Sequence, residues 1–256
     1  MGRVLVTGAA GRIGRMLRER LPGEGHELRL LDVEPVDEPD AIRASVTDLD
    51  AVTAACEGVD AVVHLGGISG EAEWVRIRDT NVEGTYCVFE AARRAGVRRV
   101  VFASSNHAVG FTHQPDDPDL EMPDDLGARP DTFYGVSKVL GEALGSLYHD
   151  RHGLDVVCLR IGTCFDAPFD LRGLSTWLSP DDCARLVHAA LTCPKPGFRT
   201  VWGISRNTRR VWSLDGGAAI GYHPQDDAER FADVVTAGDP AHDDAGRRYV
   251  GGAFTL

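Results

Sequence analysis

Short apolar runs alternate with longer amphipathic stretches from the start of the chain. The runs have strand length and consist almost entirely of apolar residues, as in strands that are covered on both faces. They are residues 3–7, 27–32, 61–65, 99–104 and 155–160. The stretches between them have helical length and cover residues 12–21, 48–56, 74–95 and 134–151. This alternation predicts an α/β fold with a doubly wound parallel sheet.

The regular alternation ends at about residue 162. Beyond it, a Ser-Pro-Asp-Asp segment that is typical of a helix start predicts a helix at 179–192. A short strand at 199–203 and a helix near 226–235 complete the pattern. We therefore expect a sheet domain at 1–162 and a small C-terminal region at 163–256 that packs on the same domain.

Composition and charge narrow the classes of function. The net charge of −12 argues against a nucleic-acid partner, because phosphate binding requires a basic face. No apolar stretch is long enough to span a membrane, so we expect no membrane partner and a cytoplasmic protein. The six cysteines include no CxxC pair and lie mostly among apolar neighbours, which favours buried side chains over a metal site or disulfides.

Three glycines, Gly8, Gly11 and Gly14, follow the first predicted strand and open the first predicted helix. Such a loop turns tightly, brings backbone N–H groups to a pyrophosphate and directs a helix N-terminus at its charge. Asp32 ends the second predicted strand, where a carboxylate can accept hydrogen bonds from ribose hydroxyls. The pattern predicts a dinucleotide-binding Rossmann fold, and the charges of Asp32 and Glu34 favour NAD over NADP.

Further cofactor contacts are less sharply defined. Arg12 lies inside the glycine loop and can help to hold a phosphate, which leaves NADP open. Asp48 precedes Leu49 at a place where the adenine could be contacted, but Asp48 is equally suited to cap the helix that follows. We assign the cofactor contacts to Gly8, Gly11, Arg12, Ile13, Gly14, Asp32, Asp48, Leu49, Leu65 and Lys138.

Tyr134 stands four residues before Lys138 in a predicted helix, although lysine is rare in this chain. Residues four apart share one helix face, so the two side chains should point the same way. An unperturbed phenol, with a pKa of about 10, is a poor base at neutral pH, and a neighbouring ammonium group lowers that value. The pair is therefore suited to remove a proton from a substrate hydroxyl beside a nicotinamide.

The glycine spacing, the Tyr134-x-x-x-Lys138 pair and the strand end "FASSNHAVG" together resemble the extended short-chain dehydrogenase/reductase family over essentially the whole chain. The resemblance implies a catalytic Ser-Tyr-Lys set that Ser105 completes, with Ser104 as the alternative. The segment "NVEGT" at 81–85 is similar to the family's helix that lines the cofactor site. The family also suggests a homo-oligomer.

Within this family, the segments at 64–69, 104–107 and 160–177 are similar to the uronate dehydrogenases. That resemblance implies NAD-dependent oxidation of D-glucuronate and D-galacturonate at C1 to the aldarolactone. Region 1–162 would bind NAD and carry the catalytic residues, and region 163–256 would help to bind the hexuronate. The implied substrate contacts are Ser69, Ser105, Asn106, His107, Tyr134, Thr163 and Arg172, with Thr163 where the group commonly has a serine.

Two of these assignments have ordinary alternatives. A guanidinium can clamp a carboxylate with two parallel hydrogen bonds, and an acidic protein needs such a local centre to hold an anion. Arg172 fits that role, but it could also be a surface residue of the loop after Pro168. His107 could contact the sugar or could be a packed structural histidine.

Two other classes of protein compete with a dehydrogenase. A nucleotide-sugar epimerase or dehydratase of the same family would use the same Tyr134 and Lys138, but such enzymes usually have a larger C-terminal region. A regulatory protein that only senses a dinucleotide would need no catalytic pair. Accumulation of NADH separates the three classes.

Overall fold

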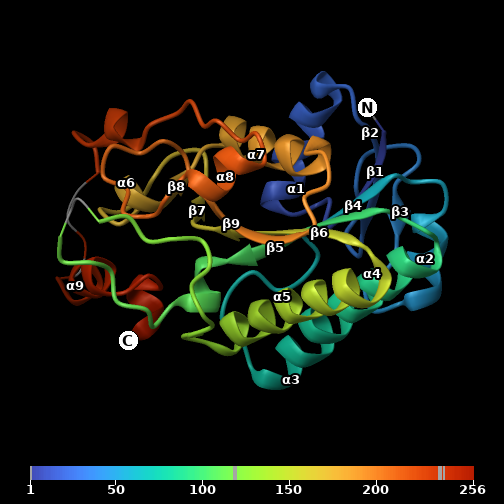
Figure 1. Ribbon diagram of the computed structural model, residues 1–256, viewed down its shortest axis with the longest axis horizontal. Helices are drawn as coiled ribbons and strands as arrows, with labels where there is room; N and C mark the ends of the chain where they lie inside the picture. The colour runs from blue at the N-terminus through green and yellow to red at the C-terminus, as the bar shows by residue number, and fades with distance from the viewer. Residues whose placement is uncertain (1, 118–119, 236–237, 239) are drawn as a thin grey trace.

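The computed structural model describes residues 2–117, 120–235, 238 and 240–256. Within this part, a parallel sheet of seven strands has the order β3-β2-β1-β4-β5-β6-β9, with helices on both faces (Figure 1). The strands are β1 (Arg3–Thr7), β2 (Glu27–Asp32), β3 (Ile42–Arg43), β4 (Ala61–His64), β5 (Arg99–Ser105), β6 (Asp155–Ile161) and β9 (Phe198–Gly203). The predicted doubly wound parallel sheet is confirmed.

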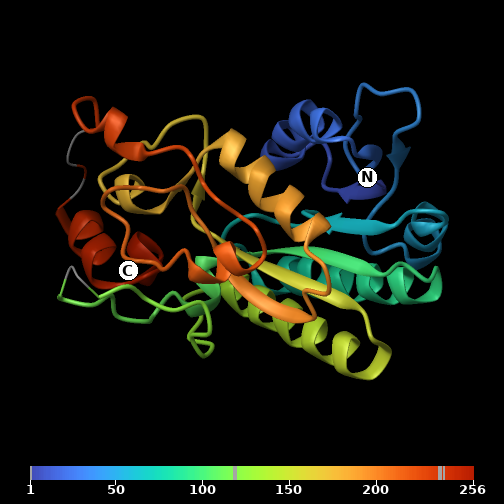
Figure 2. The same cartoon turned by 45° about the horizontal axis from the view of Figure 1, so that its top comes forward.

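The helices that cover the sheet follow the predicted stretches closely. They are α1 (Arg12–Arg20), α2 (Leu49–Cys56), α4 (Glu83–Arg94), α5 (Phe133–His152) and α7 (Pro180–Thr192). Figure 2 shows α1 and α7 on one side of the sheet and α4 and α5 on the other. Each central strand is therefore covered twice, which explains its continuous apolar sequence.

Alternate residues of each strand enter two different cores. Val4 and Val6 of β1 pack with the residues of α1 and α7 in one apolar cluster. Leu5, between them, packs with α2 and α4 in the other cluster. Because successive side chains of a strand point to opposite faces, one apolar run supplies both cores. All six cysteines are buried, as the sequence predicted.

The predicted helix at 74–95 is interrupted. The structure has a short helix α3 (Trp74–Ile77), a π-helical segment at Arg78–Val82 and then α4. The π segment contains Asn81, whose side chain accepts a hydrogen bond from Ile68 N at 2.8 Å and donates one to Ile68 O at 2.9 Å. Such bulges are frequent at functional sites, and this one anchors the loop that follows β4.

The C-terminal region contributes to the sheet as well as to the site. Strand β9 pairs with β6 at the sheet edge, and α7 covers the sheet beside α1. The predicted helix near 226–235 was wrong, since only Ala228–Phe231 forms a single 3-10 turn there. The sequence pattern also missed α9 (Pro240–Arg248), a mostly exposed helix in which Ala245 is the buried residue.

Smaller elements complete the C-terminal region. They are the strands β7 (Thr163–Cys164) and β8 (Trp177–Leu178), the helices α6 (Gly173–Thr176) and α8 (Asp215–Ala219), and a final 3-10 turn at Gly252–Thr255. In the part of the chain that the structure describes, no helix has the length and apolar character that a membrane crossing requires.

Candidate active site

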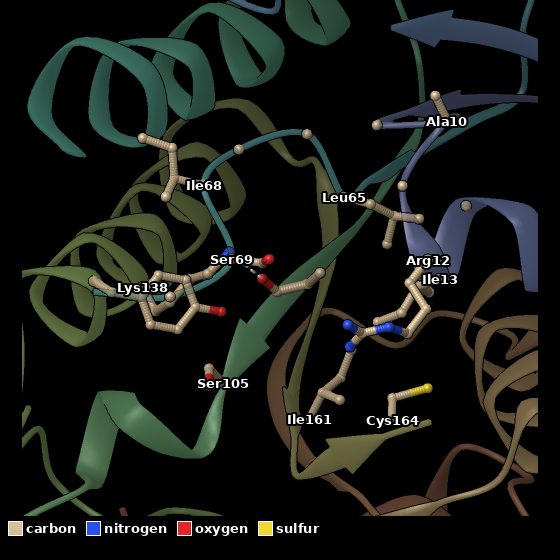
Figure 3. Close-up of a pocket in the computed structure, with 18 of the residues that line it drawn as sticks. Ala10, Arg12, Ile13, Leu65, Ile68, Ser69, Ser105, Lys138, Ile161 and Cys164 are labelled. Carbon is tan, nitrogen blue, oxygen red and sulfur yellow. Dashed lines mark hydrogen bonds between the residues drawn. The ribbon is translucent and has the colours of Figure 1, made fainter. Parts of the chain in front are cut away.

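One large pocket, with a volume of about 1060 Å³, opens at the carboxyl ends of the central strands. This edge of an open parallel sheet is where ligands of such folds bind. All of the predicted site residues except two line it: Gly8, Gly11, Arg12, Ile13, Gly14, Asp32, Leu65, Ser69, Ser105, Asn106, His107, Tyr134, Lys138, Thr163 and Arg172. Figure 3 shows Ser69, Ser105 and Lys138 grouped away from Ala10, Arg12 and Leu65. The pocket thus has a glycine-loop half and a catalytic half.

Asp48 and Leu49 do not line this pocket. The Asp48 carboxylate accepts a hydrogen bond from Ala51 N at 3.0 Å and caps α2. Leu49 packs against the core on the α2 side of the sheet. Of the two interpretations of Asp48, the structure therefore shows the helix cap.

The glycine loop requires glycine at its first and last positions. Gly8 has φ of +72°, and a side chain there would run into the backbone of Leu65 and Gly66. A side chain at Gly14 would overlap backbone carbonyl groups of the loop. At the N-cap, Gly11 offers no side chain to cap α1, so the first N–H groups of this helix remain available for an anion.

Asp32 holds the glycine loop at the end of β2. One of its carboxylate oxygens accepts a hydrogen bond from Ala10 N and the other from Glu34 N, both at 2.9 Å. A carboxylate has further lone pairs, so Asp32 can still accept hydrogen bonds from a ribose. The Arg12 guanidinium stacks 3.7 Å from the centre of the Phe165 ring at the same pocket. Together, these features fit a dinucleotide whose pyrophosphate lies on the loop and whose ribose lies on Asp32.

Tyr134 lies in the first turn of α5. Thr132 caps that helix by accepting a hydrogen bond from Gly135 N at 2.9 Å. Glu71, in the loop after β4, accepts a second one from Tyr134 N at 3.0 Å. Two independent caps therefore fix the backbone that carries the phenol, and the Glu71 contact ties it to the loop of Ser69.

Lys138 and Ser105 lie beside this phenol. Lys138 is buried, and its Nζ donates a hydrogen bond to Ala103 O at 2.7 Å and lies 5.3 Å from the centre of the Tyr134 ring. Ser105 ends β5, and its Oγ accepts a hydrogen bond from His107 N at 3.2 Å. The structure brings the three predicted catalytic residues together. Ser104, the alternative to Ser105, instead donates to Glu142 at 2.6 Å.

The protonation of this pair differs from the sequence expectation. Burial raises the pKa of Tyr134 to about 12, although its hydrogen bond with Ser105 acts in the opposite direction. Burial also lowers the pKa of Lys138 to about 8, although the charge of Glu142 opposes the change. The sequence analysis expected the neighbouring ammonium group to lower the pKa of Tyr134, but the pKa is raised, because burial has the largest effect and the charge of Asp131 acts in the same direction.

A buried ion pair supports the lysine, and the sequence analysis missed it. Glu142 follows Lys138 by one helical turn and accepts bidentate hydrogen bonds from Arg160 at 2.9 and 2.8 Å. Since Glu142 also accepts from Ser104, it joins α5 to the ends of β5 and β6. The repeat of Tyr134, Lys138 and Glu142 at intervals of four was the available signal, because it places all three on one helix face.

Arg172 lies where the C-terminal region meets the pocket. Its Nη2 donates a hydrogen bond to Val250 O at 2.6 Å, and its Nη1 reaches Thr163 Oγ1 at 3.4 Å. Among the described residues, its buried Nε has no hydrogen-bond partner. Burial lowers the pKa of this guanidinium, and Asp170 and Asp131 partly compensate. A half-buried guanidinium at a pocket wall, whose charge the described residues only partly balance, is suited to bind an anion.

The last residues of the chain close this end of the pocket. Asn106 Nδ2 donates to Val250 O at 3.1 Å, so Asn106 and Arg172 hold the same carbonyl. Gly252 has φ of +61°, and a side chain there would meet the Arg172 side chain. Phe254 lines the pocket with its ring centre 4.3 Å from that of His107. The sequence analysis missed this turn, although its Gly-Gly pair was a possible signal.

The groups around the pocket suit one kind of reaction, the removal of a proton from a substrate hydroxyl. A phenol, an ammonium group and a serine hydroxyl meet at one wall, and a guanidinium faces the same space from another. Proton removal from the hydroxyl of an anionic substrate is the reaction that these groups suit. Among the described residues, no three His, Cys, Asp or Glu side chains are arranged to hold a metal ion.

Comparison with known proteins agrees with this geometry. Residues 4–173 match the model of the NAD dependent epimerase/dehydratase family. The chain is 43% identical to a uronate dehydrogenase of Pseudomonas putida, over 99% of this chain and 96% of that protein. It is 40% identical to an NAD-dependent glucose-6-phosphate dehydrogenase of Haloferax volcanii, over 89% of this chain and 95% of that protein.

A solved structure is similar over nearly the whole chain. It is a mutant uronate dehydrogenase from Agrobacterium tumefaciens complexed with NAD, with a TM-score of 0.90 and 40% identity. The similarity covers 99% of this chain and 96% of that one. It therefore includes the C-terminal region as well as the sheet.

Proposed function

Since the chain belongs to the NAD dependent epimerase/dehydratase family, we propose that it binds NAD and oxidises D-glucuronate and D-galacturonate at C1 to the aldarolactone. Membership of this family confirms the resemblance that the sequence motifs indicated. The similarity to uronate dehydrogenases over almost the full length supports the substrate assignment.

The observation that carries this proposal is the position of Arg172. Its half-buried guanidinium lines the same pocket as Tyr134, and its buried Nε has no hydrogen-bond partner among the described residues. A hexuronate carries its reactive hydroxyl at C1 and its carboxylate on C5, the two ring carbons that flank the ring oxygen. A clamp on the carboxylate therefore orients the hydroxyl towards the phenol, and correct orientation supplies much of the catalysis.

Each residue of the catalytic set has its own role in the reaction. Tyr134 removes the proton of the anomeric hydroxyl, and Ser105 hydrogen-bonds the same substrate oxygen as its charge changes. Lys138, held by Ala103 O, directs its other N–H donors towards a ribose and the phenol. Bound NAD supplies the hydride acceptor and a positively charged ring. Positive charge in this pocket stabilises the phenolate and so offsets the burial that raises the pKa of Tyr134.

The substrate contacts follow from the same pocket. Ser69, Asn106, His107 and Thr163 line the same pocket as Tyr134 and Arg172. Their hydroxyl, amide and imidazole groups would contact the sugar hydroxyls. Thr163 preserves a hydroxyl where the uronate dehydrogenases commonly have serine.

The decisive experiment measures NADH absorbance with purified protein, NAD and one sugar at a time. We expect turnover with D-glucuronate and D-galacturonate and none with D-glucose. D-Glucose 6-phosphate is included because one relative is named for that substrate. Preference for the phosphate ester would overturn the uronate assignment, and no NADH with any free sugar would favour an epimerase or dehydratase.

We also propose that the protein is a cytoplasmic homo-oligomer, because the family suggests assembly. Size-exclusion chromatography with light scattering tests this directly, and a mass of 27.6 kDa in solution would contradict it.

A further inference from the structure

Asp131 is a fully buried carboxylate that no step above uses. Its side chain is 0% exposed and lies just before α5. One oxygen forms a 2.8 Å hydrogen bond with Nδ1 of His107, and the other accepts a hydrogen bond from Thr132 Oγ1 at 3.0 Å. A carboxylate buried away from water lowers the stability of the fold unless it is paired and hydrogen-bonded. The pairing of Asp131 with His107 meets this condition, and its position at the pocket suggests a function.

The chain makes room for this carboxylate at two separate glycines. A side chain on Gly110 or on Gly251 would overlap the Asp131 side chain. These glycines are adjacent, since Gly251 N donates to Gly110 O at 2.9 Å. Gly110 and Gly251, which lie far apart in sequence, thus leave space for the Asp131 side chain. The His107 ring lies between this carboxylate and the pocket.

Asp131 determines which nitrogen of His107 carries the proton. An ionised carboxylate only accepts hydrogen bonds, so Nδ1 must be the N–H donor of the imidazole. In the tautomer with its proton on Nδ1, the Nε2 atom carries a lone pair that can accept a hydrogen bond. The His107 ring lies with its centre 5.9 Å from that of Tyr134 and 4.3 Å from that of Phe254, at the pocket wall.

An acceptor at this place complements the other groups of the site. Arg172 and Lys138 have only donors to offer. The Asn106 amide nitrogen already donates to Val250 O. A sugar hydroxyl between these groups needs a partner for its own proton, and Nε2 of His107 provides one.

We propose that Asp131 is a positioning residue, which holds His107 in the tautomer whose Nε2 accepts a hydrogen bond from a ring hydroxyl of the sugar acid. This inference rests on the proposed function, because it assumes a uronate in the pocket. It assigns Asp131 a part in substrate recognition, through the orientation of His107.

The first test is Asp131→Asn. An amide can donate to Nδ1 and thereby turn Nε2 into an N–H donor, so we expect the KM for D-glucuronate to rise about tenfold. The KM for NAD should stay within about twofold, because the glycine loop is unchanged. An unchanged KM for the uronate in a folded variant would overturn the proposal.

His107→Asn provides a second variant that does not depend on the folding of the first. The asparagine amide can take the place of Nδ1 and keep the hydrogen bond to Asp131, but nothing replaces Nε2. We expect the same rise of about tenfold in the uronate KM with an unchanged melting temperature. A normal uronate KM in this variant would show that Nε2 does not contact the sugar.

The double variant separates recognition from a purely structural role. Once Nε2 is absent, Asp131→Asn in the His107→Asn background should raise the uronate KM by less than about twofold further. If the two single effects multiply instead, Asp131 acts on the fold and the proposal is wrong. Wild-type protein in the same assay distinguishes the two failures. Its inactivity with uronates would refute the proposed function, and with it the role of Asp131 in binding a uronate.

Uronates that lack one ring hydroxyl identify the group that Nε2 contacts. One deoxy analogue should lose affinity with the wild type and show no further loss with His107→Asn. If every analogue responds equally in both proteins, no hydroxyl is bound by His107 and the proposal fails.

Discussion

The two halves of the pocket are built in different ways. The glycine-loop half comes mainly from one continuous segment, β1 to β2, with Leu65 added from the loop after β4, and offers mainly backbone N–H groups and the Asp32 carboxylate. The catalytic and substrate half is assembled from the ends of β5 and β6, the start of α5, Arg172 and the final turn. Its functional groups are buried side chains with altered pKa values. Binding of a common cofactor needs a local motif, whereas selection of one substrate needs tertiary assembly.

The largest expected effect lies in the second half, at the phenol. Tyr134→Phe removes the proposed base, and we expect kcat to fall about 1000-fold with little change in the KM for NAD. The matched control is Tyr148→Phe, because Tyr148 is on the same helix but donates to Glu90 away from the pocket. Near-normal turnover of Tyr134→Phe would show that Tyr134 is not the base, and the half of the pocket that contains it could no longer be called catalytic.

The anion clamp gives the next effect. Arg172→Met keeps much of the side-chain volume and removes the charge, so the KM for D-glucuronate should rise about 100-fold, equivalent to roughly 3 kcal/mol. The KM for NAD should hardly change, and the preference for D-glucuronate over neutral D-glucose should fall. Equal rises in both KM values would mean that Arg172 supports the whole pocket and not the substrate end alone.

The raised pKa of Tyr134 and the lowered pKa of Lys138 predict that kcat/KM depends on pH. The described residues of the glycine-loop half provide no such pair of groups. Since Tyr134 must lose its proton and its pKa is raised to about 12, kcat/KM should rise about tenfold per pH unit between pH 6 and 8. Above pH 8, Lys138 loses its charge because its pKa is lowered to about 8, and the profile should level off. Assays at constant ionic strength would reveal this shape, and a flat profile from pH 6 to 8 would contradict it.

The smallest effect belongs to the glycine-loop half. Asp32→Asn keeps an acceptor for Ala10 N but removes the charge, so the KM for NAD should rise about fivefold, the loss of roughly 1 kcal/mol. The preference for NAD over NADP should weaken, and kcat with the uronate should hold. A larger fall in kcat than in affinity for NAD would show that Asp32 also organises the catalytic half.

Part of the site followed from the sequence because its geometry is local. Gly8, Gly14 and Asp32 surround one turn between a strand and a helix, and four-residue spacing sets Tyr134 beside Lys138 in any helix. The strand bounds of β1 and β2 agree with the predicted runs because β1 is buried on both faces from Val4 on, and Leu30 and Leu31 of β2 are buried on opposite faces. The predicted helix near 226–235 failed even though Ala228 and Phe231 pack with Trp177 in an apolar cluster. Asp227 caps only a single 3-10 turn there, and tertiary packing holds the stretch without a continuous helix.

Other features of the site depend on contacts between residues that are distant in sequence, which a local sequence pattern cannot reveal. Asp131 and Gly251 are far apart in sequence, and only folding places the glycine where the carboxylate needs space. The pKa of Tyr134 likewise depends on how many atoms exclude water from it, and sequence analysis counted the neighbouring charge but not the burial.

The sequence by itself thus determined the parallel sheet, the glycine loop with Asp32, and the face shared by Tyr134 and Lys138. Only the tertiary structure decided that Arg172 reaches the pocket with its buried Nε unpaired among the described residues, that Asp48 caps a helix, and that the final turn closes the substrate end. The physical reason is the range of the interactions. Helix and strand periodicity and turn geometry act over a few residues, whereas burial, buried charge and close packing depend on all the segments that meet at one place.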